Sequence, residues 1–298
     1  MSSDLILPQG YILQVADSAS HRYKEYQIPK RTGGFRTIHH PSKELKLLQR
    51  WLLREVIEKL PVHNSATAYR RGYSIVKNAE RHVGSKYLLR MDLADFFPSL
   101  ADQDIRKLLV MNKDLFSEWC EEDTELFCRL VCKYGILTIG APSSPALSNA
   151  LCWKMDVDLA SLAFKYGVIY SRYADDLFFS TSTKGILVAI EKEVGKLLSE
   201  LDYPQALQVN LKKTHHSSKR NRRRVTGVTL GSDGRLSLGR AMKRRIRTLI
   251  FRLESLTEKE RQSLAGLLAY CMDVEPDFIN KLIQKYKPER VRQARSPS

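Results

Sequence analysis

Three aspartates, Asp92, Asp175 and Asp176, stand in apolar surroundings where an ordinary protein core would not keep them. Asp92 follows the apolar residues 87–89, and the other two interrupt the apolar, aromatic and β-branched residues 167–180. Carboxylates gathered at low dielectric repel one another or take up protons unless cations are present. Mg²⁺ suits such oxygen-rich sites because it accepts few carboxylates and leaves places for substrate phosphates. Two such ions, about 3.5–4 Å apart, activate an attacking hydroxyl and stabilise the leaving oxygen.

Each aspartate also has an ordinary explanation. An Asp-Asp pair between two strands is most often a solvated turn. Asp92 alone could equally be a helix cap. The choice between metal ligands and these ordinary roles therefore depends on the wider sequence pattern.

The composition bounds the class of partner. The chain of 298 residues carries 49 Lys and Arg against 33 Asp and Glu, a net charge of +16, which indicates nucleic acid or an anionic membrane as partner. No apolar run approaches the roughly 18 residues that span a bilayer, and the N-terminus lacks the pattern of a signal peptide. The five cysteines form no framework or zinc pattern, which favours buried free thiols. We therefore expect a cytoplasmic protein with no membrane partner.

The positive charge is concentrated near the C-terminus. Residues 219–298 hold 20 of the 49 Lys and Arg but only 8 of the 33 Asp and Glu. Charged residues usually form a solvated helix surface. Their concentration in one segment favours nucleic-acid binding over a solvated surface.

The periodicity of apolar residues predicts a mixed α and β chain with a helical end. Strands are expected on both sides of Gly33-Gly34 within residues 27–41, and at residues 87–93, 167–180, 224–230 and 235–238. Helices are expected at residues 45–60, 102–110, 124–134, 144–166, 184–201, 240–256, 258–271 and 276–286. The polar residues 288–298 are expected to fray.

Three sequence motifs decide the interpretation of the aspartates. They are RMDLADFFPS at residues 90–99, GAPSSPALSN at residues 140–149 and YADD at residues 173–176. With these, the chain resembles the reverse transcriptases, whose motifs A, B and C they match in order. The resemblance covers nearly the whole chain and implies an α+β right-hand polymerase with fingers, palm and a short helical thumb. Fingers would occupy residues 1–88, palm 89–235 with part of the fingers within 100–150, and thumb 236–298.

The resemblance also implies roles around the metal site. Asp92 and Asp175 would be the main ligands of two Mg²⁺ ions, with Asp176 a looser third carboxylate. The Leu93 carbonyl would be a further ligand. Phe97 falls where the family has an aromatic gate that excludes a ribose 2′-OH, although a place in the core is its ordinary alternative. Phe96 is expected in the core.

Other positions match segments that bind the nucleotide in the family. Lys30 and Arg36 on the first hairpin could clasp a triphosphate, and ordinary surface charges are the alternative. Lys213, in a segment that resembles motif D, could assist the departing pyrophosphate. Gly140 and Ala141 let the backbone approach the nucleotide closely, because Gly lacks a side chain.

One position departs from the family pattern. Ile139 precedes Gly140, where many relatives have Gln. An apolar side chain cannot make the amide hydrogen bonds to nucleotide or template. Polymerisation is still expected, whereas fidelity and nucleotide affinity become less predictable. Residues 69–75 (YRRGYSI) resemble the fingers motif that follows the first hairpin.

Two short signatures point to one kind of reverse transcriptase. Residues 78–82 (NAERH) match the NAxxH signature of bacterial retron enzymes, and residues 225–227 match their VTG signature. An isolated Asn or His of this kind is more often a satisfied core polar group. Both signatures in the proper order favour a retron enzyme. The residues expected to bind RNA, from these signatures and two basic clusters, are Asn78, His82, Arg222, Arg223, Arg224, Thr226, Gly227, Lys243, Arg244 and Arg245.

A retron enzyme implies further partners. A structured noncoding RNA would be both partner and template. Synthesis from dNTPs, primed by an RNA 2′-OH, would give a short single-stranded DNA (msDNA). The resemblance also implies antiphage defence with a separate effector protein. Because the chain ends soon after the thumb, we expect no maturase, endonuclease or RNase H extension.

Two alternatives stay open. One is another bacterial reverse transcriptase, such as a group II-like or abortive-infection enzyme. The other is a noncatalytic RNA-binding subunit of a defence complex. The intact set of three aspartates disfavours this second alternative, because a pure binder gains nothing from unpaired carboxylates that face phosphates.

Overall fold

The computed structural model describes residues 1–30 and 33–295 and divides into two compact units. Unit 1 comprises residues 1–72, 89–179 and 185–215, and unit 2 comprises residues 73–88, 180–184 and 216–298. The boundaries expected for fingers, palm and thumb do not coincide with this division and stay a prediction. None of the helices in the described ranges is both long and apolar enough to cross a membrane.

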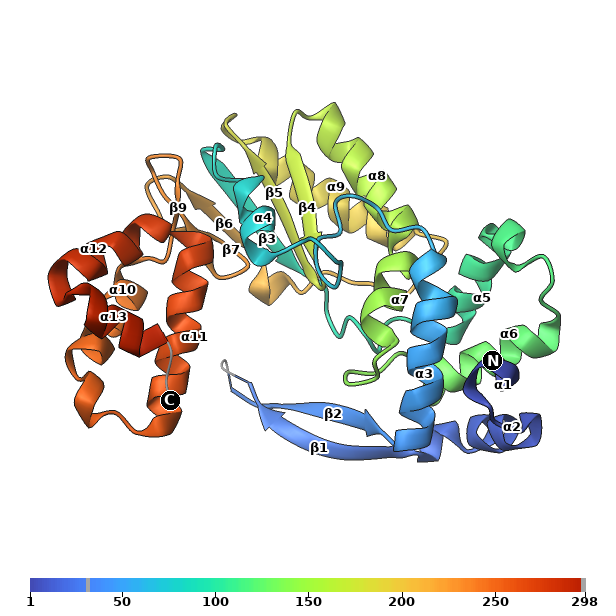
Figure 1. Cartoon of the computed structure of the whole chain (residues 1–298). Coiled ribbons are helices and arrows are strands. Elements are labelled where there is room, and N and C mark those ends of the chain that lie inside the picture. The colour runs from blue at the N-terminus through green and yellow to red at the C-terminus, as the bar shows by residue number, and fades with distance from the viewer. Residues whose placement is uncertain (31–32, 296–298) are drawn as a thin grey trace. The chain divides into compact units, whose positions relative to one another are not determined.

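Unit 1 begins with short helices and a long hairpin (Figure 1). The elements are α1 (Ser2–Leu5), α2 (Gln9–Asp17), a 3₁₀ turn (Ala19–His21), β1 (Tyr23–Pro29), β2 (Phe35–Pro41), α3 (Lys43–Glu55) and a 3₁₀ turn (Ile57–Lys59). The strands pair antiparallel, with Tyr23 opposite Pro41 and Pro29 opposite Phe35. The expected hairpin is therefore present, and its first strand starts earlier than predicted. The Ser42 side chain caps α3 by accepting a hydrogen bond from the Leu45 amide.

A four-stranded sheet in the order β4-β5-β3-β6 carries the motif aspartates (Figure 1). Its strands are β3 (Tyr87–Asp92), β4 (Ile169–Tyr173), β5 (Asp176–Thr181) and β6 (His215–Ser218). The hairpin expected at residues 167–180 is β4–β5. The order places β5 directly beside β3, so Asp92 and the Asp175-Asp176 pair lie at neighbouring positions of the sheet.

Five helices complete unit 1, and one prediction about them was wrong. They are α5 (Asp102–Met111), α6 (Glu121–Val131), α7 (Ser144–Leu151), α8 (Trp153–Lys165) and α9 (Ile186–Glu200), followed by a 3₁₀ turn (Leu211–Lys213). Residues 144–166 form two helices, because the backbone leaves the helical conformation at the fully buried Cys152. The break lets α7 lie buried while α8 packs against β4 and α9.

Unit 2 combines α4 with a small sheet and a group of helices. Its elements are α4 (Ile75–Glu80), β7 (Arg223–Val225), β8 (Val228–Leu230), β9 (Leu236–Ser237), α10 (Arg240–Phe251), a 3₁₀ turn (Leu253–Ser255), α11 (Glu258–Val274), α12 (Pro276–Tyr286) and α13 (Pro288–Arg295). The single strand expected at 224–230 is divided by a turn at Thr226-Gly227, where φ is 47° and 87°. The fraying expected from residue 288 was also wrong, because Val291 and Ala294 bury one face of α13. Residues 296–298 lie outside the described ranges.

Candidate active site

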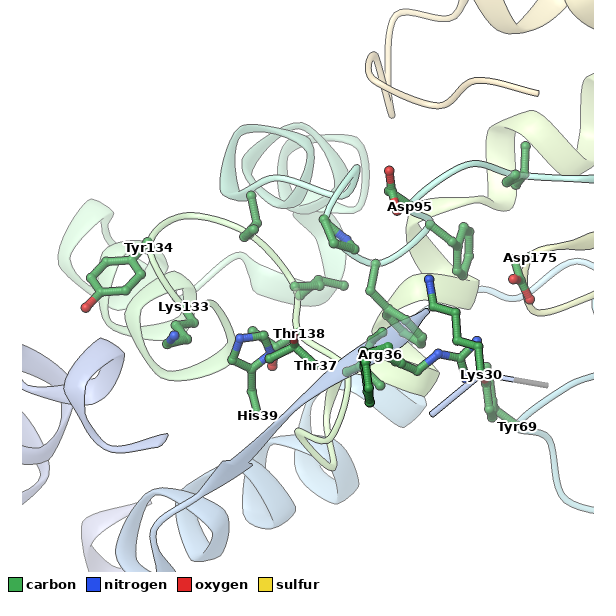
Figure 2. A pocket seen from close by; sticks show the side chains of 18 of the residues that line it. Lys30, Arg36, Thr37, His39, Tyr69, Asp95, Lys133, Tyr134, Thr138 and Asp175 are labelled. Carbon is green, nitrogen blue, oxygen red and sulfur yellow. The ribbon is translucent and has the colours of Figure 1, made fainter. Parts of the chain in front are cut away.

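A cavity of about 610 Å³ lies within unit 1 (Figure 2). Its walls come from β2, from residues 93–98 after β3, from residues 133–139, and from the β4–β5 turn. The expected site residues among those that line it are Leu93, Asp175, Lys30, Arg36, Phe97 and Lys213. The fold thus gathers carboxylate, cationic and aromatic groups from segments far apart in the sequence.

Asp92 is buried beside this cavity and is neutralised by a lysine. The Asn210 amide donates to the Asp92 carbonyl over 2.7 Å, which holds residues 208–213 along the end of β3. The Lys213 ammonium then donates to Oδ1 and Oδ2 of Asp92 over 2.8 and 3.0 Å. Asp92 is only 4% exposed, whereas Lys213 is exposed. The ammonium therefore supplies the countercharge that a buried carboxylate requires.

Asp175 faces the cavity from the β4–β5 turn (Figure 2). Its carbonyl accepts a hydrogen bond from the Leu93 amide over 2.8 Å, which ties the turn to the end of β3. Burial raises the pKa of the Asp175 carboxyl, and the charge of Asp92 raises it further. A backbone hydrogen bond and the charges of Lys213 and Arg36 lower that pKa. Two carboxylates thus repel each other at the site, and nearby cations relieve the repulsion.

Asp176, the first residue of β5, is bound to a different cation. Nε and Nη2 of Arg90, on the neighbouring strand β3, donate to Oδ1 of Asp176 over 3.0 and 2.8 Å. Burial raises the pKa of the Asp176 carboxyl to about 6, although Arg90 opposes the increase. In the described part of the chain, the cavity lining includes Asp175 but not Asp176. Asp176 is therefore farther from the cavity than its neighbour in sequence.

The donor chemistry of this site fits a divalent cation. Residues 1–30 and 33–295 contain no group of three His, Cys, Asp or Glu side chains close enough to hold a metal ion. However, the Lys213 ammonium already lies on Asp92 and lowers the pKa of Asp175, as a bound cation would. The oxygen donors of Asp92 and Asp175 are the type that Mg²⁺ prefers. A metal ion held here would need Asp92 to exchange its ammonium partner for the ion.

The two phenylalanines after β3 differ in burial. Phe96 is 5% exposed, whereas Phe97 is partly exposed at the cavity. Their rings meet edge to face with centroids 5.4 Å apart. Phe96 thus lies in the core as expected, and the role of Phe97 as a sugar gate stays a prediction.

Gly140 has a structural reason to be glycine. Its φ is 117°, and a Cβ at this position would lie 2.6 Å from the His39 carbonyl oxygen. The His39 amide donates to the Ile139 carbonyl over 2.8 Å, so this loop lies directly on β2. Ile139 lines the cavity, whereas Ala141 is 2% exposed. Contact of Gly140 and Ala141 with a nucleotide stays a prediction, and close packing against β2 is what the structure shows for Gly140.

Several cavity residues were not predicted as site residues from the sequence. They are Phe35, Thr37, His39, Tyr69, Asp95, Pro98, Lys133, Tyr134, Ile136, Leu137 and Thr138, together with Phe96 and Ile139. Asp95, Phe96 and Pro98 belong to the motif at residues 90–99, and Tyr69 belongs to the segment 69–75, so the motif pattern gave a signal for these four. The loop at residues 133–138 carries no motif, so its place in the cavity could not be predicted from the sequence.

The NAxxH residues of unit 2 point into the protein. Asn78 and His82 are both 0% exposed. Nδ1 of His82 lies 2.8 Å from Oγ of Ser180, and burial lowers the pKa of His82 to about 3. Both side chains are thus enclosed in unit 2, and the RNA binding expected for them from the signature stays a prediction.

The VTG signature makes an internal contact with the NAxxH helix. The Thr226 hydroxyl donates to the carbonyl of Ile75, in the first turn of α4, over 3.0 Å. Arg223 is 1% exposed, and its guanidinium donates to the carbonyl oxygens of Ser85 and Gly231. Both Nη atoms of Arg223 thus donate inside unit 2, and the RNA contact expected for this residue stays a prediction. The two signatures thus form parts of one packed structure.

Other basic residues of unit 2 differ in accessibility. Arg222, Arg224, Arg244 and Arg245 are exposed. Lys243 is only partly exposed, because it pairs with Glu275 and its Nζ lies 5.6 Å from the centre of the Phe278 ring. The four exposed arginines are therefore better placed than Lys243 to meet phosphates.

A family model and several relatives match most of this chain. A family model described as "Reverse transcriptase (RNA-dependent DNA polymerase)" matches residues 28–230. The chain is 36% identical to the retron Ec83 reverse transcriptase of Escherichia coli, over 96% of this chain and 93% of that protein. It is 33% identical to the retron Ec73 reverse transcriptase of the same species, over 97% of this chain and 94% of that protein.

Solved structures show the same fold at low sequence identity. The apo telomerase of Candida tropicalis matches with a TM-score of 0.50 and 14% identity, over 89% of this chain and 57% of that one. The telomerase of Candida albicans in complex with a TWJ fragment of telomeric RNA matches with a TM-score of 0.50 and 12% identity, over 98% and 66%. At such identities the likeness concerns fold alone, and it confirms the predicted α+β architecture.

Proposed function

Because this chain belongs to the retron reverse transcriptases, and is therefore an RNA-directed DNA polymerase, we propose that it copies part of a structured noncoding RNA into msDNA. The cavity of unit 1 carries this proposal. It presents the carboxylate of Asp175 together with the cations Lys30 and Arg36. A nucleoside triphosphate needs both kinds of group, because its phosphates require positive charge and its transfer requires metal ligands.

Enzymes of this family depend on a divalent metal, and we assign two Mg²⁺ ions to Asp92 and Asp175. Asp176 and the Leu93 carbonyl would complete the ligand set. When bound, the ions would activate the attacking hydroxyl and stabilise charge on the transferred phosphate. A backbone hydrogen bond joins the end of β3, which carries Asp92, to the β4–β5 turn, which carries Asp175. The two carboxylates would therefore hold the ions at a fixed position relative to the transferred phosphate.

The remaining cavity residues bind and select the nucleotide. Arg36 and Lys30 neutralise the triphosphate from the β1–β2 hairpin, and Phe97 limits the space beside the sugar. Lys213 is held at the cavity by Asp92 and can neutralise the departing pyrophosphate. The Gly140-Ala141 backbone lies next to the cavity residue Ile139, close to where the nucleotide would bind.

We assign recognition of the RNA to exposed residues of unit 2. Arg222, Arg224, Arg244 and Arg245 are accessible cations, and Gly227 lies in an exposed turn. Lys243 and Thr226 would support this surface through their internal contacts. A 2′-OH of the RNA would serve as the primer. The protein would act in antiphage defence together with a separate effector protein. Its location would be the cytoplasm, which the five free thiols favour.

Sequencing of nucleic acid that copurifies with the protein tests this proposal. We expect one RNA joined to one short DNA in the wild type. The Asp175→Asn variant should carry the same RNA without DNA, because only synthesis is lost. A wild type that carries diverse RNAs without a linked DNA would instead favour another class of reverse transcriptase, and one that carries RNA but never synthesises DNA would favour a noncatalytic subunit.

A further inference from the structure

Tyr69 occupies the cavity in a strained backbone conformation. It is 48% exposed and lines the cavity toward the same end as Asp175, whereas Tyr134 lies at the far end (Figure 2). Its φ is 58°, in the left-handed region that a bulky side chain rarely adopts. Strained residues of this kind cluster at ligand sites, where the surroundings hold them in place.

The surroundings of the Tyr69 hydroxyl are charged groups of the site. Burial raises the pKa of this hydroxyl, and the negative charge of Asp175 raises it further. The positive charge of Arg36 acts in the opposite direction. Tyr69 is therefore near both the carboxylate assigned to the metal ions and the cation assigned to the triphosphate.

A buried amide fixes the backbone beside Tyr69. Nδ2 of Asn149, in α7, donates to the carbonyl of Ala68 over 2.8 Å. Oδ1 of the same amide accepts a hydrogen bond from Nη1 of Arg172 over 3.1 Å. Nη1 of Arg172 also donates to the carbonyl of Ala174, the residue before Asp175, over 3.2 Å. One guanidinium thus links the segment that carries Tyr69 to the turn that carries Asp175.

The guanidinium is itself held rigidly. Nε and Nη2 of Arg172 donate to the carboxylate of Asp156 over 2.9 and 2.6 Å, and both side chains are 0% exposed. The Tyr170 hydroxyl donates to the same carboxylate over 2.7 Å. Ala174 has φ of 56°, so the network restrains a second left-handed residue. The strained cavity residue Tyr69 and the strained Ala174, which precedes Asp175, are thus both connected to one buried ion pair.

We propose that Tyr69 contacts the incoming deoxynucleoside triphosphate, and that Asn149 is a positioning residue that holds Tyr69 in register with Asp175. The inference rests on the proposed function, since it takes the cavity to be the nucleotide site. The Tyr69 hydroxyl donates to a phosphate or sugar oxygen, and its ring packs beside the nucleotide. Asn149 contributes through the Ala68 carbonyl and touches no substrate.

Two substitutions at Tyr69 separate binding from folding. Tyr69→Phe removes only the hydroxyl, and KM for dNTP should rise about fivefold with kcat nearly unchanged, as expected when one hydrogen bond is removed. Tyr69→Asn removes the ring and relaxes the backbone, because Asn tolerates the left-handed region. KM should then rise by about tenfold or more, whereas the thermal unfolding midpoint should stay or increase. A merely structural tyrosine would instead lower that midpoint.

The role of Asn149 is tested by asking whether the effect of its substitution on KM requires the Tyr69 side chain. Asn149→Asp keeps an acceptor for Arg172 but loses the donor to Ala68, so KM for dNTP should rise. In a Tyr69→Asn background the same change should leave KM unaltered, because Asn149 acts through Tyr69. Tyr11→Phe, on the exposed face of α2, is the matched control and should change neither KM nor stability.

The assays use the full chain on a generic primed RNA, with the rise in unfolding midpoint caused by dNTP as a second readout. Equal KM and equal dNTP-induced stabilisation in wild type, Tyr69→Phe and Tyr69→Asn would overturn the inference. Weaker binding of the primed RNA at unchanged KM for dNTP would assign Tyr69 to the template and overturn it equally. Absence of a linked RNA–DNA product from cells would count against the proposed function only, because the generic template does not require it.

Discussion

In unit 1 several motif side chains, among them Asp175 and Phe97, line a cavity, whereas in unit 2 the signature side chains Asn78 and His82 face the interior. Asp175 and Arg36 line the cavity, and their charges act on each other. His82 and Arg223 are at most 1% exposed, and their polar atoms bind groups of unit 2 itself. A sequence signature can therefore mark either a ligand contact or an internal contact that shapes a surface.

This difference changes which residues should affect which measurement. In unit 1, replacement of a motif side chain should alter chemistry while the fold survives. In unit 2, replacement of a signature side chain should alter stability first, and the exposed arginines should carry the binding of RNA. In each unit, this expectation can be tested by comparing a variant with a control variant at a neighbouring residue or at a residue of the same chemical type.

The largest effect is expected for Asp175→Asn, which keeps the size of the side chain but removes its charge. DNA synthesis should fall by at least about a hundredfold, because metal-assisted charge stabilisation is lost. Binding of RNA should persist. Asp158→Asn, outside the cavity and paired with Lys154, is the matched control and should retain synthesis. A folded Asp175→Asn protein with near-normal synthesis, measured by primer extension, would remove Asp175 from the metal site.

The next effect compares two adjacent arginines of unit 2. Arg223→Ala should lower the free energy of unfolding by about 2 kcal/mol, because buried carbonyl oxygens lose their donors. Arg224→Ala should change it by less than about 0.5 kcal/mol, because this side chain is exposed. Denaturant unfolding of both variants measures the difference. Similar losses in the two proteins would mean that burial does not distinguish them.

His82 predicts a pH dependence of stability. Its folded-state pKa of about 3 lies below the unfolded value because burial disfavours the charged ring. The neutral ring therefore stabilises the fold fully above pH 6.5, and this contribution is lost as the pH falls. Between pH 7.5 and 5.5 the loss should be about 1.4 kcal/mol in wild type. In His82→Gln that component should disappear from urea unfolding curves, and an unchanged pH dependence would contradict the assignment.

The sequence predicted the site better than the details of the backbone. The resemblance of residues 90–99 and 173–176 to the reverse transcriptase motifs implied that Asp92 and Asp175 lie together, and the structure joins the ends of β3 and the β4–β5 turn. The break at Cys152 was not predicted, since α7 and α8 continue one apolar period. The Arg172–Asp156 pair was also missed, because charged residues in a strand and a helix suggest exposure until tertiary contacts are known.

In unit 2 the sequence predicted the elements but not the direction of their side chains. The sequence predicts one strand through the VTG residues, because β-branched Val and Thr favour strands. Gly227 adopts its positive φ freely, whereas the left-handed Thr226 makes a tertiary contact, the hydrogen bond from its hydroxyl to the Ile75 carbonyl, that the local sequence does not show. Accessibility of Arg223 and Arg224 likewise differs only through tertiary contacts.

Phe97→Ala provides a further test of unit 1 on the side of substrate choice. Removal of the ring should open space for a ribose 2′-OH, so the preference for dNTP over rNTP should fall by about tenfold, as expected for steric pocket differences. The ratio of kcat/KM for the two substrates measures this change. Phe116→Ala, outside the cavity lining of the described residues, serves as the control. An unchanged ratio would leave Phe97 with a packing role beside Phe96.

The smallest effect is expected for the exposed cations of α10. Arg244→Ala combined with Arg245→Ala removes two accessible charges without disturbing Ile246 or Ile250, which bury the opposite face. RNA affinity should weaken, and the log–log dependence on salt should flatten by about one unit for each phosphate that is no longer neutralised. Synthesis on a generic primed template should change less, because the cavity is untouched. Lys184→Ala with Lys192→Ala, exposed lysines outside α10, controls for the removal of charge alone. If the arginine and lysine variants show equal RNA affinity and equal slope across a salt series, α10 does not recognise the RNA. The exposed residues that bind RNA would then lie on another surface of unit 2.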